Sequence, residues 1–201
     1  MREHMMSTIT PTFRQGQPAD APFLAELVNL AGEGLPLRLW ESMCEDGETA
    51  WDVGRRRAAR EEGCFSYRHA TMAEAGGQVA AALISYPQAP EPQPIDYATM
   101  PPAFVPLQEL ENLAPNTWYI NILAVYPDHR RQGLGAELMA VAEKQAAKHG
   151  KPGLSVIVSD ANVGAKHLYL SIGYRQTAIR PQVKCDWSTD GTSWILLTKM
   201  L

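Results

Sequence analysis

Residues 117–137 read Thr-Trp-Tyr-Ile-Asn-Ile-Leu-Ala-Val-Tyr-Pro-Asp-His-Arg-Arg-Gln-Gly-Leu-Gly-Ala-Glu, and this stretch decides the fold of the chain. Trp118 to Tyr126 is a bounded apolar run rich in aromatic and branched residues, which predicts a buried strand. Pro127 ends the strand, because proline has no N–H to give to a neighbouring strand. A glycine-rich turn then leads into a helix-forming run that begins at Ala136.

The glycine-rich turn predicts an anion site. Gly133 and Gly135 let the backbone approach a ligand closely, and the first turn of the helix adds free N–H groups and the positive end of its dipole. Arg130 and Arg131 add fixed positive charge. The turn lacks the third glycine of the dinucleotide fingerprint and the Gly-Lys-Ser/Thr of the P-loop. The alternative is an ordinary strand-to-helix turn with solvated arginines.

Length and composition limit the class of protein. The 201 residues are 45% hydrophobic and 20% charged, which predicts one globular domain over residues 1–201. A net charge of -4 argues against a nucleic-acid partner, and no apolar run approaches the ~20 residues of a membrane span. Cys44, Cys64 and Cys185 are odd in number and widely spaced, so we expect neither a disulfide framework nor a metal site. These features favour a cytoplasmic protein.

The N-terminal part of the chain predicts a strand, several helices and a hairpin. We expect a first strand at residues 9–14 and helices within 20–62, the first capped by Asp20 with an apolar face that includes Phe23 and Leu30. Residues 55–57 are three arginines, interpreted as a solvated helix face, with a phosphate-binding role as the minority alternative. Strands at 65–74 and 78–86 flank an Ala-Gly-Gly turn, which indicates a hairpin.

Residues 87–116 contain eight prolines and little periodicity apart from a short helix within 104–113. A loop of this length inside a compact domain usually serves binding or is mobile. We interpret it as an insertion that covers the substrate end of the site.

The C-terminal part of the chain alternates helices and strands. Leu134, Leu138 and Ala142 recur at helical spacing in a helix that closes at Gly150, and a buried strand follows at 154–158. A helix at 162–171 is expected to place Val163 on its apolar face, and strands follow at 174–179 and 193–200. Antiparallel strands followed by helix-linked strands predict an α/β protein with a mixed twisted sheet and helices on both faces.

A second motif lies downstream of the glycine-rich turn. The run from 162 to 174 carries the spacing Asn-x-x-Ala-x-x-Leu-Tyr-x-x-x-Gly-Tyr, at Asn162, Ala165, Leu168, Tyr169, Gly173 and Tyr174. Together with the preceding Arg-x-x-Gly-x-Gly turn, it resembles the GNAT superfamily of acetyl-CoA-dependent N-acetyltransferases. Two linked motifs over residues 117–175 are far more specific than either motif alone.

The resemblance implies a mostly antiparallel twisted sheet with a splayed central strand pair, and a binding site for acetyl-CoA. The backbone of the strand would hydrogen-bond the pantetheine arm of the coenzyme, and the glycine-rich turn would hold its pyrophosphate. The cofactor-binding residues implied in this way are Leu123, Ala124, Val125, Arg130, Arg131, Gln132, Gly133, Leu134, Gly135, Ala136, Asn162 and Tyr169. No metal is implied.

The resemblance also implies two catalytic residues. Tyr169 stands where the family places a hydroxyl near the coenzyme sulfur, to protonate the departing thiolate; the alternative is a helix tyrosine packed in the core. Relatives often carry a Glu or His at the strand positions of Tyr119 and Asn121, and this chain has neither. Asn121 can orient a water or the acetyl carbonyl but cannot accept a proton. Other candidate bases are Glu33, Asp96, Glu109 and Glu111, each of which reads more readily as a solvated surface acid.

The function implied is an acyltransferase that moves an acetyl group from acetyl-CoA to a primary amine by direct attack in a ternary complex. Neither motif contains a cysteine, which argues against an acyl-enzyme intermediate. The alternative is a catalytically silent acyl-CoA-binding or sensing domain, favoured by the missing strand acid. The acceptor, a small molecule or a peptide amine, stays open, and a homodimer is common for this fold.

Overall fold

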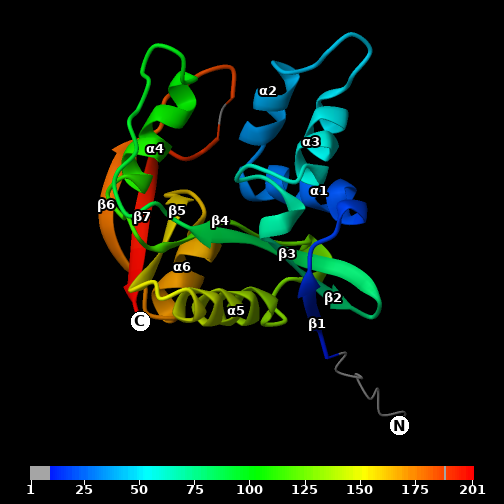
Figure 1. The fold of residues 1–201 in the computed structure, drawn as a ribbon, viewed down its shortest axis with the longest axis vertical. Helices are drawn as coiled ribbons and strands as arrows, with labels where there is room; N and C mark the ends of the chain where they lie inside the picture. The colour runs from blue at the N-terminus through cyan, green and yellow to red at the C-terminus, as the bar shows by residue number, and fades with distance from the viewer. Residues whose placement is uncertain (1–9, 188) are drawn as a thin grey trace.

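The computed structural model describes residues 10–187 and 189–201. A seven-stranded sheet forms the centre of the molecule, with the strand order β1-β2-β3-β4-β5-β7-β6 (Figure 1). All neighbouring strands are antiparallel except β4 and β5, which run parallel. This is the mixed, mostly antiparallel α/β sheet that the sequence predicted.

The strands lie close to the predicted segments, with two differences. The first begins at Thr12, and Ile9 of the expected strand lies outside the described residues. The strand expected from residue 65 begins only at Ala70, because the Ser66 hydroxyl accepts a hydrogen bond from the backbone N–H of Arg68 and caps a 3-10 turn. The strands are β1 Thr12–Gln15, β2 Ala70–Ala75, β3 Gln78–Pro87, β4 Trp118–Val125, β5 Gly153–Ser159, β6 Arg175–Pro181 and β7 Ser193–Met200.

One group of helices rises from one face of the sheet and a second group covers the other (Figure 1). The first group comprises α1 Ala21–Ala31, α2 Leu35–Glu41, α3 Ala50–Ala59 and α4 Val105–Glu111. The second comprises α5 Leu134–Lys148 and α6 Val163–Ser171. Helices α1 to α3 stand over the β2–β4 half of the sheet and α4 stands over the β6 and β7 half, so the first group forms two arms.

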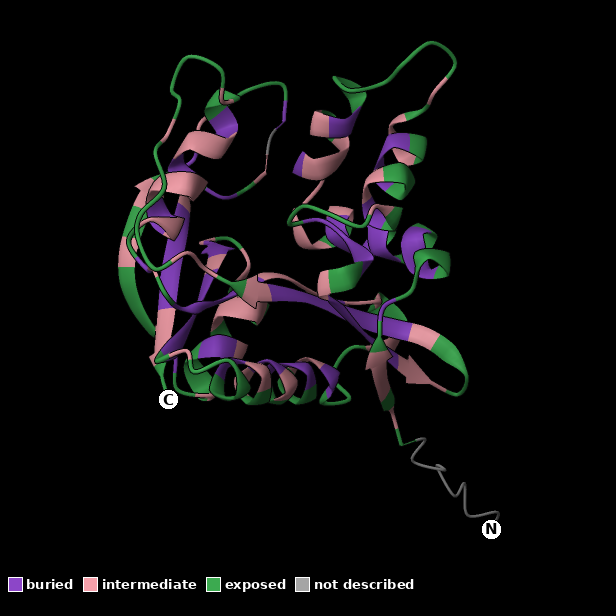
Figure 2. Ribbon diagram, in the orientation of Figure 1, coloured by how far each residue is buried: buried purple, intermediate pink, exposed green. Residues whose placement is uncertain are grey.

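Burial follows this layering, with the central strands buried along most of their length (Figure 2). Some predicted core positions are exposed: Phe23 is 41% exposed, Leu30 is 36% exposed and Val163 is 71% exposed. Val163 lies on the same side of α6 as Leu170, which is 45% exposed, whereas Ala165 and Tyr169 face the core. The expected apolar faces are therefore wrong at these three positions.

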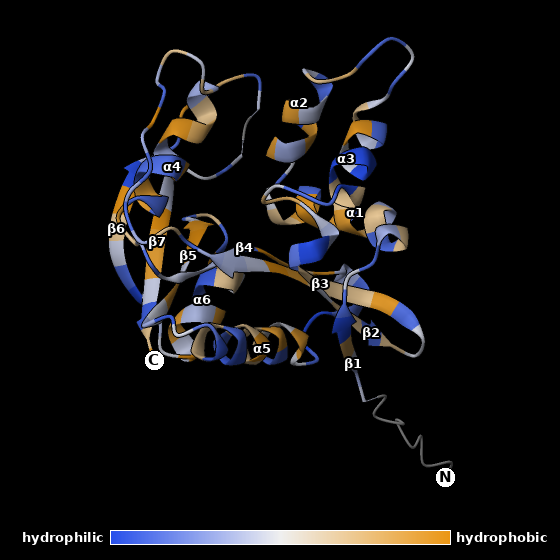
Figure 3. Ribbon diagram, viewed as in Figure 1, coloured by the Kyte–Doolittle hydropathy of each residue, from blue (hydrophilic) through white to orange (hydrophobic). Residues whose placement is uncertain are grey.

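The three arginines of α3 form part of a hydrophilic helix surface (Figure 3). Arg55 pairs with Asp52 at 3.0 Å and Arg56 pairs with Glu48 at 3.0 Å, both at the surface. Arg57 is half-buried, and burial lowers the pKa of its guanidinium. The ion pairs support a solvated helix face for Arg55 and Arg56 but not for Arg57.

The proline-rich segment 87–116 is tied together at its base. The backbone N–H of Gln88 donates to Thr117 at 2.8 Å, and that of Asn116 donates to Ala89 at 2.7 Å. Leu110 of α4 is fully buried in a core shared with β7. The segment is therefore packed at its base and helix, while much of residues 90–101 is exposed. No helix of the described residues is long and apolar enough to cross a membrane.

Candidate functional site

The two parallel central strands separate part of the way along their length. β4 and β5 are paired at Trp118, Tyr119 and Ile120 only. Beyond that point β4 stays paired with β3 and β5 stays paired with β7. A fork therefore opens between residues 121–125 of β4 and residues 157–159 of β5.

A β-bulge in β4 lies where the fork begins. Ile84 of β3 pairs with Ile122, but the next residue, Ser85, pairs with Ile120, so Asn121 is an extra residue. The bulge reverses the alternation of side chains. Ile120 belongs to the core under α5, whereas Ile122 packs in the core under α1.

The register indicates which backbone groups of β4 face the fork. The N–H of Tyr126 donates to Ala80 of β3 at 2.9 Å. Since residues of an antiparallel ladder alternate in direction, Ala124 also points towards β3, and Leu123 and Val125 point towards the fork. The strand places two of the three expected backbone partners on the open side, and Ala124 on the closed side.

A cleft follows the fork, and we call it the fork cleft. Side chains from β4, β5, α6, β7 and the end of α1 form its walls. Its lining residues are Ala31, Glu33, Asn121, Leu123, Val156, Ile157, Val158, Ser159, Asn162, Ala165, Tyr169 and Trp194. The structure thus brings five of the residues selected from the sequence into one cleft: Glu33, Asn121, Leu123, Asn162 and Tyr169.

Tyr169 lies on α6 and is 4% exposed, with its ring 5.7 Å from that of Tyr174. Burial raises the pKa of the Tyr169 hydroxyl well above its ordinary value. The hydroxyl therefore stays protonated at neutral pH and is available as a proton donor to a group in the fork cleft.

Asn162 caps the helix that carries Tyr169. Its side-chain oxygen accepts a hydrogen bond from the backbone N–H of Ala165 at 3.1 Å. This bond satisfies one of the free N–H groups of the first turn of α6. Asn162 thus holds α6 in place, and its side chain also lines the fork cleft.

The glycine-rich turn forms the N-terminus of α5. Gly133 is the N-cap residue with a φ of 88°, a conformation that favours glycine, and no side chain caps the helix. Arg131 also has a positive φ, at 64°. A Cβ on Gly135 would lie 3.0 Å from Cδ2 of Leu168, so this glycine allows α5 to pack against α6. That contact places the turn beside the helix that lines the fork cleft.

The expected arginines differ in their surroundings. The Nε of Arg130 donates to the carbonyl of Val125 at 3.2 Å, which ties the turn to the end of β4. Arg131, Gln132 and Ala136 are exposed, whereas Leu134 is buried in the core. The backbone N–H groups at the start of α5 remain the part of this turn best suited to an anion.

The four candidate bases lie in different environments. Asp96 is exposed and caps a local turn, and Glu109 pairs with Arg180 at 2.8 Å. Glu33 lines the fork cleft, and its carboxylate accepts a hydrogen bond from the Thr189 hydroxyl at 2.8 Å. Glu111 is partly buried, which differs from the solvated acid that the sequence favoured.

Glu111 has a neighbour that the sequence analysis did not connect with it. Gln88 donates a hydrogen bond to its carboxylate at 3.3 Å. Burial raises the pKa of Glu111, and the bond from Gln88 partly opposes that rise. The signal that links Gln88 to Glu111 is spatial, because the two residues are 23 positions apart in the sequence.

Comparison with known proteins agrees with this geometry. The family model for the acetyltransferase (GNAT) family matches residues 37–174. Comparison with curated proteins gives no match. Many solved structures match this chain.

Three of these structures illustrate the fold. One, described as an acetyltransferase, is 20% identical with a TM-score of 0.64, over 94% of this chain and 98% of its own. An N-acetyltransferase from Staphylococcus aureus Mu50 is 18% identical with a TM-score of 0.63, over 94% and 100% of the two chains. A Bacillus subtilis acetyltransferase in complex with CoA is 16% identical with a TM-score of 0.57, over 96% and 99%.

At these identities the solved structures establish the shared fold, and the family model spans more than half of the chain. The chain therefore belongs to the GNAT family of acetyltransferases, an acetyl-CoA-binding family of transferases.

Proposed function

We propose that this enzyme transfers the acetyl group of acetyl-CoA directly to a primary amine, within a ternary complex. The observation that carries the proposal is the fork cleft, in which a protonated buried tyrosine and the open edge of β4 meet beside the uncapped N-terminus of α5. A thioester with a long flexible arm and a pyrophosphate needs these three features together.

Each part of the site has a binding role in this proposal. The backbone of Leu123 and Val125 would pair with the amide groups of the pantetheine arm, as an added strand pairs with a sheet edge. The N–H groups of Gly133, Gly135 and Ala136 would hold the pyrophosphate. The backbone conformation of Gly133 supports this fit, because the turn leaves the helix N-terminus without a side-chain cap.

The chemistry requires a neutral amine, since an ammonium has no lone pair with which to attack the thioester. Asn121 would orient the acetyl carbonyl or a water, and Tyr169 would donate its proton to the departing sulfur. The acceptor would approach from the side of the two arms, where segment 87–116 and helices α1 to α3 flank the sheet (Figure 1).

The competing proposal is an acyl-CoA-binding domain without turnover, and Asn121 in place of a strand acid favours it. The experiment measures release of free CoA thiol from acetyl-CoA in the presence of a panel of small primary amines and peptides. Acceptor-dependent release supports transfer. Tight binding of acetyl-CoA with no release on a broad panel supports the binding domain instead.

A further inference from the structure

Among the residues that line the fork cleft, only Glu33 has a charged side chain. The other polar residues of the lining are Asn121, Ser159, Asn162 and Tyr169, and the rest are apolar or aromatic. Glu33 takes part in none of the ion pairs formed by the described residues. A carboxylate that lines a cleft without a cationic neighbour is suited to bind a cation from solution.

The backbone at Glu33 has the left-handed conformation, with a φ of 53°. Its N–H donates to Leu30 at 3.4 Å and the N–H of Gly34 donates to Asn29 at 3.0 Å, which is the pattern of a Schellman motif at the end of α1. The position of Glu33 in this motif is usually glycine, because a Cβ is disfavoured at positive φ. The chain thus keeps a side chain where the fold alone favours glycine.

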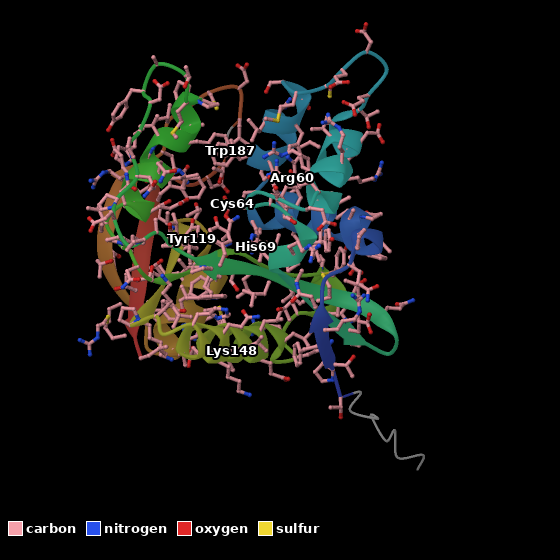
Figure 4. All side chains as sticks on the ribbon, in the orientation of Figure 1. Arg60, Cys64, His69, Tyr119, Lys148 and Trp187 are labelled. Carbon is pink, nitrogen blue, oxygen red and sulfur yellow. The ribbon has the colours of Figure 1, made fainter. Side chains whose placement is uncertain are left out.

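The loop between β6 and β7 holds Glu33 in place. The indole N–H of Trp187 donates to the Glu33 carbonyl at 2.8 Å, and the Thr189 hydroxyl donates to the carboxylate oxygen Oε2 at 2.8 Å. Trp187 is 5% exposed and packs in a core that also contains Leu110 of α4. Figure 4 shows Trp187 between the two arms. The carboxylate therefore has a fixed position, although its backbone conformation is strained.

The second carboxylate oxygen of Glu33 is available to a ligand. Oε2 accepts the bond from Thr189, whereas Oε1 accepts no hydrogen bond from the described part of the chain. Trp194 also lines the fork cleft, and its ring is parallel to that of Trp187, with an interplanar angle of 3° and centroids 6.0 Å apart. The face of an indole ring attracts a cation. The cleft thus contains a carboxylate and an indole, a combination suited to an ammonium group.

Glu33 and Tyr169 come to the fork cleft from opposite faces of the sheet. Glu33 follows α1 on the face with the two arms, whereas Tyr169 lies on α6, which covers the other face (Figure 1). In the proposed reaction Tyr169 meets the departing sulfur, so a group held by Glu33 is a part of the acceptor away from the reacting nitrogen. This separation suits the chemistry, because a carboxylate beside the reacting nitrogen would favour its protonated form, which cannot attack.

We propose that Glu33 and Trp194 bind a second positive charge of the acceptor, so that the preferred acceptor is an amine with a cationic group apart from the nitrogen that is acetylated. This inference rests on the proposed acetyl transfer and adds the class of acceptor to it. Glu33 determines specificity and takes no part in proton transfer. An acceptor with a carboxylate in the same place would be repelled, and one with an apolar group would bind without the ion pair.

The first test compares three series of acceptors whose far end is positive, neutral or negative: α,ω-diamines, n-alkylamines and ω-amino acids, each with chains of about three to six carbons. With the unaltered enzyme we expect kcat/KM of the best diamine to exceed that of the matching alkylamine at least about tenfold, because hydrogen bonds to charged groups are strong in a partly buried site. The amino acids should be the poorest acceptors. The preference should lie in KM more than in kcat, since the second charge is bound equally before and during attack.

Two variants test whether the charge of Glu33 causes this preference. Glu33→Gln keeps the size of the side chain and an oxygen for the Thr189 bond but removes the charge, so the preference for diamines should disappear. Glu26→Gln is the matched control, because Glu26 is an exposed glutamate of α1 whose carboxylate accepts a hydrogen bond from the Tyr126 hydroxyl at 2.6 Å. The control should keep the preference for diamines, since Glu26 is not among the residues that line the cleft.

A second measurement does not depend on turnover. Tetramethylammonium is a cation that cannot be acetylated, and its titration should shift the indole ¹⁵N–¹H signal of Trp194, assigned with Trp194→Phe. The uncharged tert-butyl alcohol, which has a similar shape, should leave that signal in place. The shift should be lost in Glu33→Gln and retained in Glu26→Gln.

The outcomes separate this proposal from the proposed function. Equal kcat/KM for diamines and alkylamines, or a preference that survives in Glu33→Gln, would overturn the role of Glu33 and leave acetyl transfer intact. Equal losses for all three series in Glu33→Gln would also overturn it, because they would assign Glu33 to proton transfer or to joining the two arms. Absence of transfer to every amine would refute the proposed function, whereas the titration with tetramethylammonium would still support or overturn the cation site.

Discussion

Tyr169 and Tyr174 place their rings 5.7 Å apart in one core, but only Tyr169 lines the fork cleft. The hydroxyl of Tyr174 is buried without a hydrogen-bond partner among the described residues. Burial raises the pKa of both hydroxyls. The chain thus contains a pair of similar tyrosines that differ in access to the cleft.

Replacing Tyr169 by Phe should lower kcat by at least about tenfold with the affinity for acetyl-CoA nearly unchanged, because the change removes a proton donor and keeps the ring. Tyr174→Phe is the control and should leave kcat unchanged and Tm equal or higher, since it removes a buried unpaired hydroxyl. Steady-state kinetics and calorimetry measure both. A lower Tm in Tyr169→Phe with full activity would show that Tyr169 packs in the core and is not the proton donor.

Charge at the start of α5 should control binding of acetyl-CoA. Ala136→Glu adds a carboxylate to the first turn of the helix. There it interacts favourably with the helix dipole but would repel a pyrophosphate. Ala140→Glu, on an exposed site one turn later, is the control. We expect acetyl-CoA to raise the Tm of the control and of the unaltered protein, by RT ln(1 + [L]/Kd) in free energy, and not that of Ala136→Glu. An equal rise in all three would place the pyrophosphate elsewhere.

Asn162 should stabilise the fold as the N-cap of α6. Asn162→Ala removes the cap of α6 and should lower the free energy of unfolding by about 1 kcal/mol. Asn162→Asp keeps an acceptor for the N–H of Ala165 and should restore most of this loss. Denaturant unfolding measures both variants. If both retain wild-type stability, the cap does not contribute to the fold.

The Arg14–Asp20 pair should make stability depend on acid pH. Hydrogen bonds from Arg14, at 2.7 and 2.8 Å, hold the pKa of Asp20 below its usual range. The stabilisation is then present above the unfolded pKa of about 3.9 and lost as pH falls through the lower folded pKa. Asp20→Asn should cost about 2 kcal/mol at pH 7 and flatten the acid limb of the stability curve. An unchanged acid limb would contradict this account.

Glu111 should have the opposite effect on how stability depends on pH. Its pKa is raised in the folded state, so its contribution is full below the unfolded pKa of about 4.3 and is lost as pH rises through the folded pKa. Glu111→Gln should therefore increase Tm at pH 8 more than at pH 4. Thermal unfolding at the two pH values measures the difference. A variant that is less stable at pH 8 than the unaltered enzyme would show that the carboxylate is stabilising there.

Local sequence signals were sufficient for most of the fold. Val79 to Tyr86 is apolar enough to be a central strand, and Gly133 fixes the start of α5. The second motif also predicted that Tyr169 and Asn162 would share a site, and both line the fork cleft. Val163 was assigned to the wrong face of α6, since helical spacing places it beside the exposed Leu170 and not beside Tyr169.

The surroundings of Glu111 were harder to predict because its partner is far away in the sequence. Glu111 belongs to a segment without clear periodicity, and its partner Gln88 is 23 positions earlier. Only the closure of the base of that segment brings the carboxylate to Gln88. The bulge at Asn121 was also hidden, since the apolar run from Trp118 to Tyr126 reads as a regular strand.

The extra residue in β4 determines which mutations the strand can tolerate. Loss of the single codon for Asn121 would restore an even alternation of side chains and would exchange the two faces of the rest of β4. A substitution at that position leaves the register of β4 intact, whereas an insertion or deletion would shift it. We expect descendants of this gene to preserve both the length of β4 and a polar side chain at position 121, which lines the fork cleft.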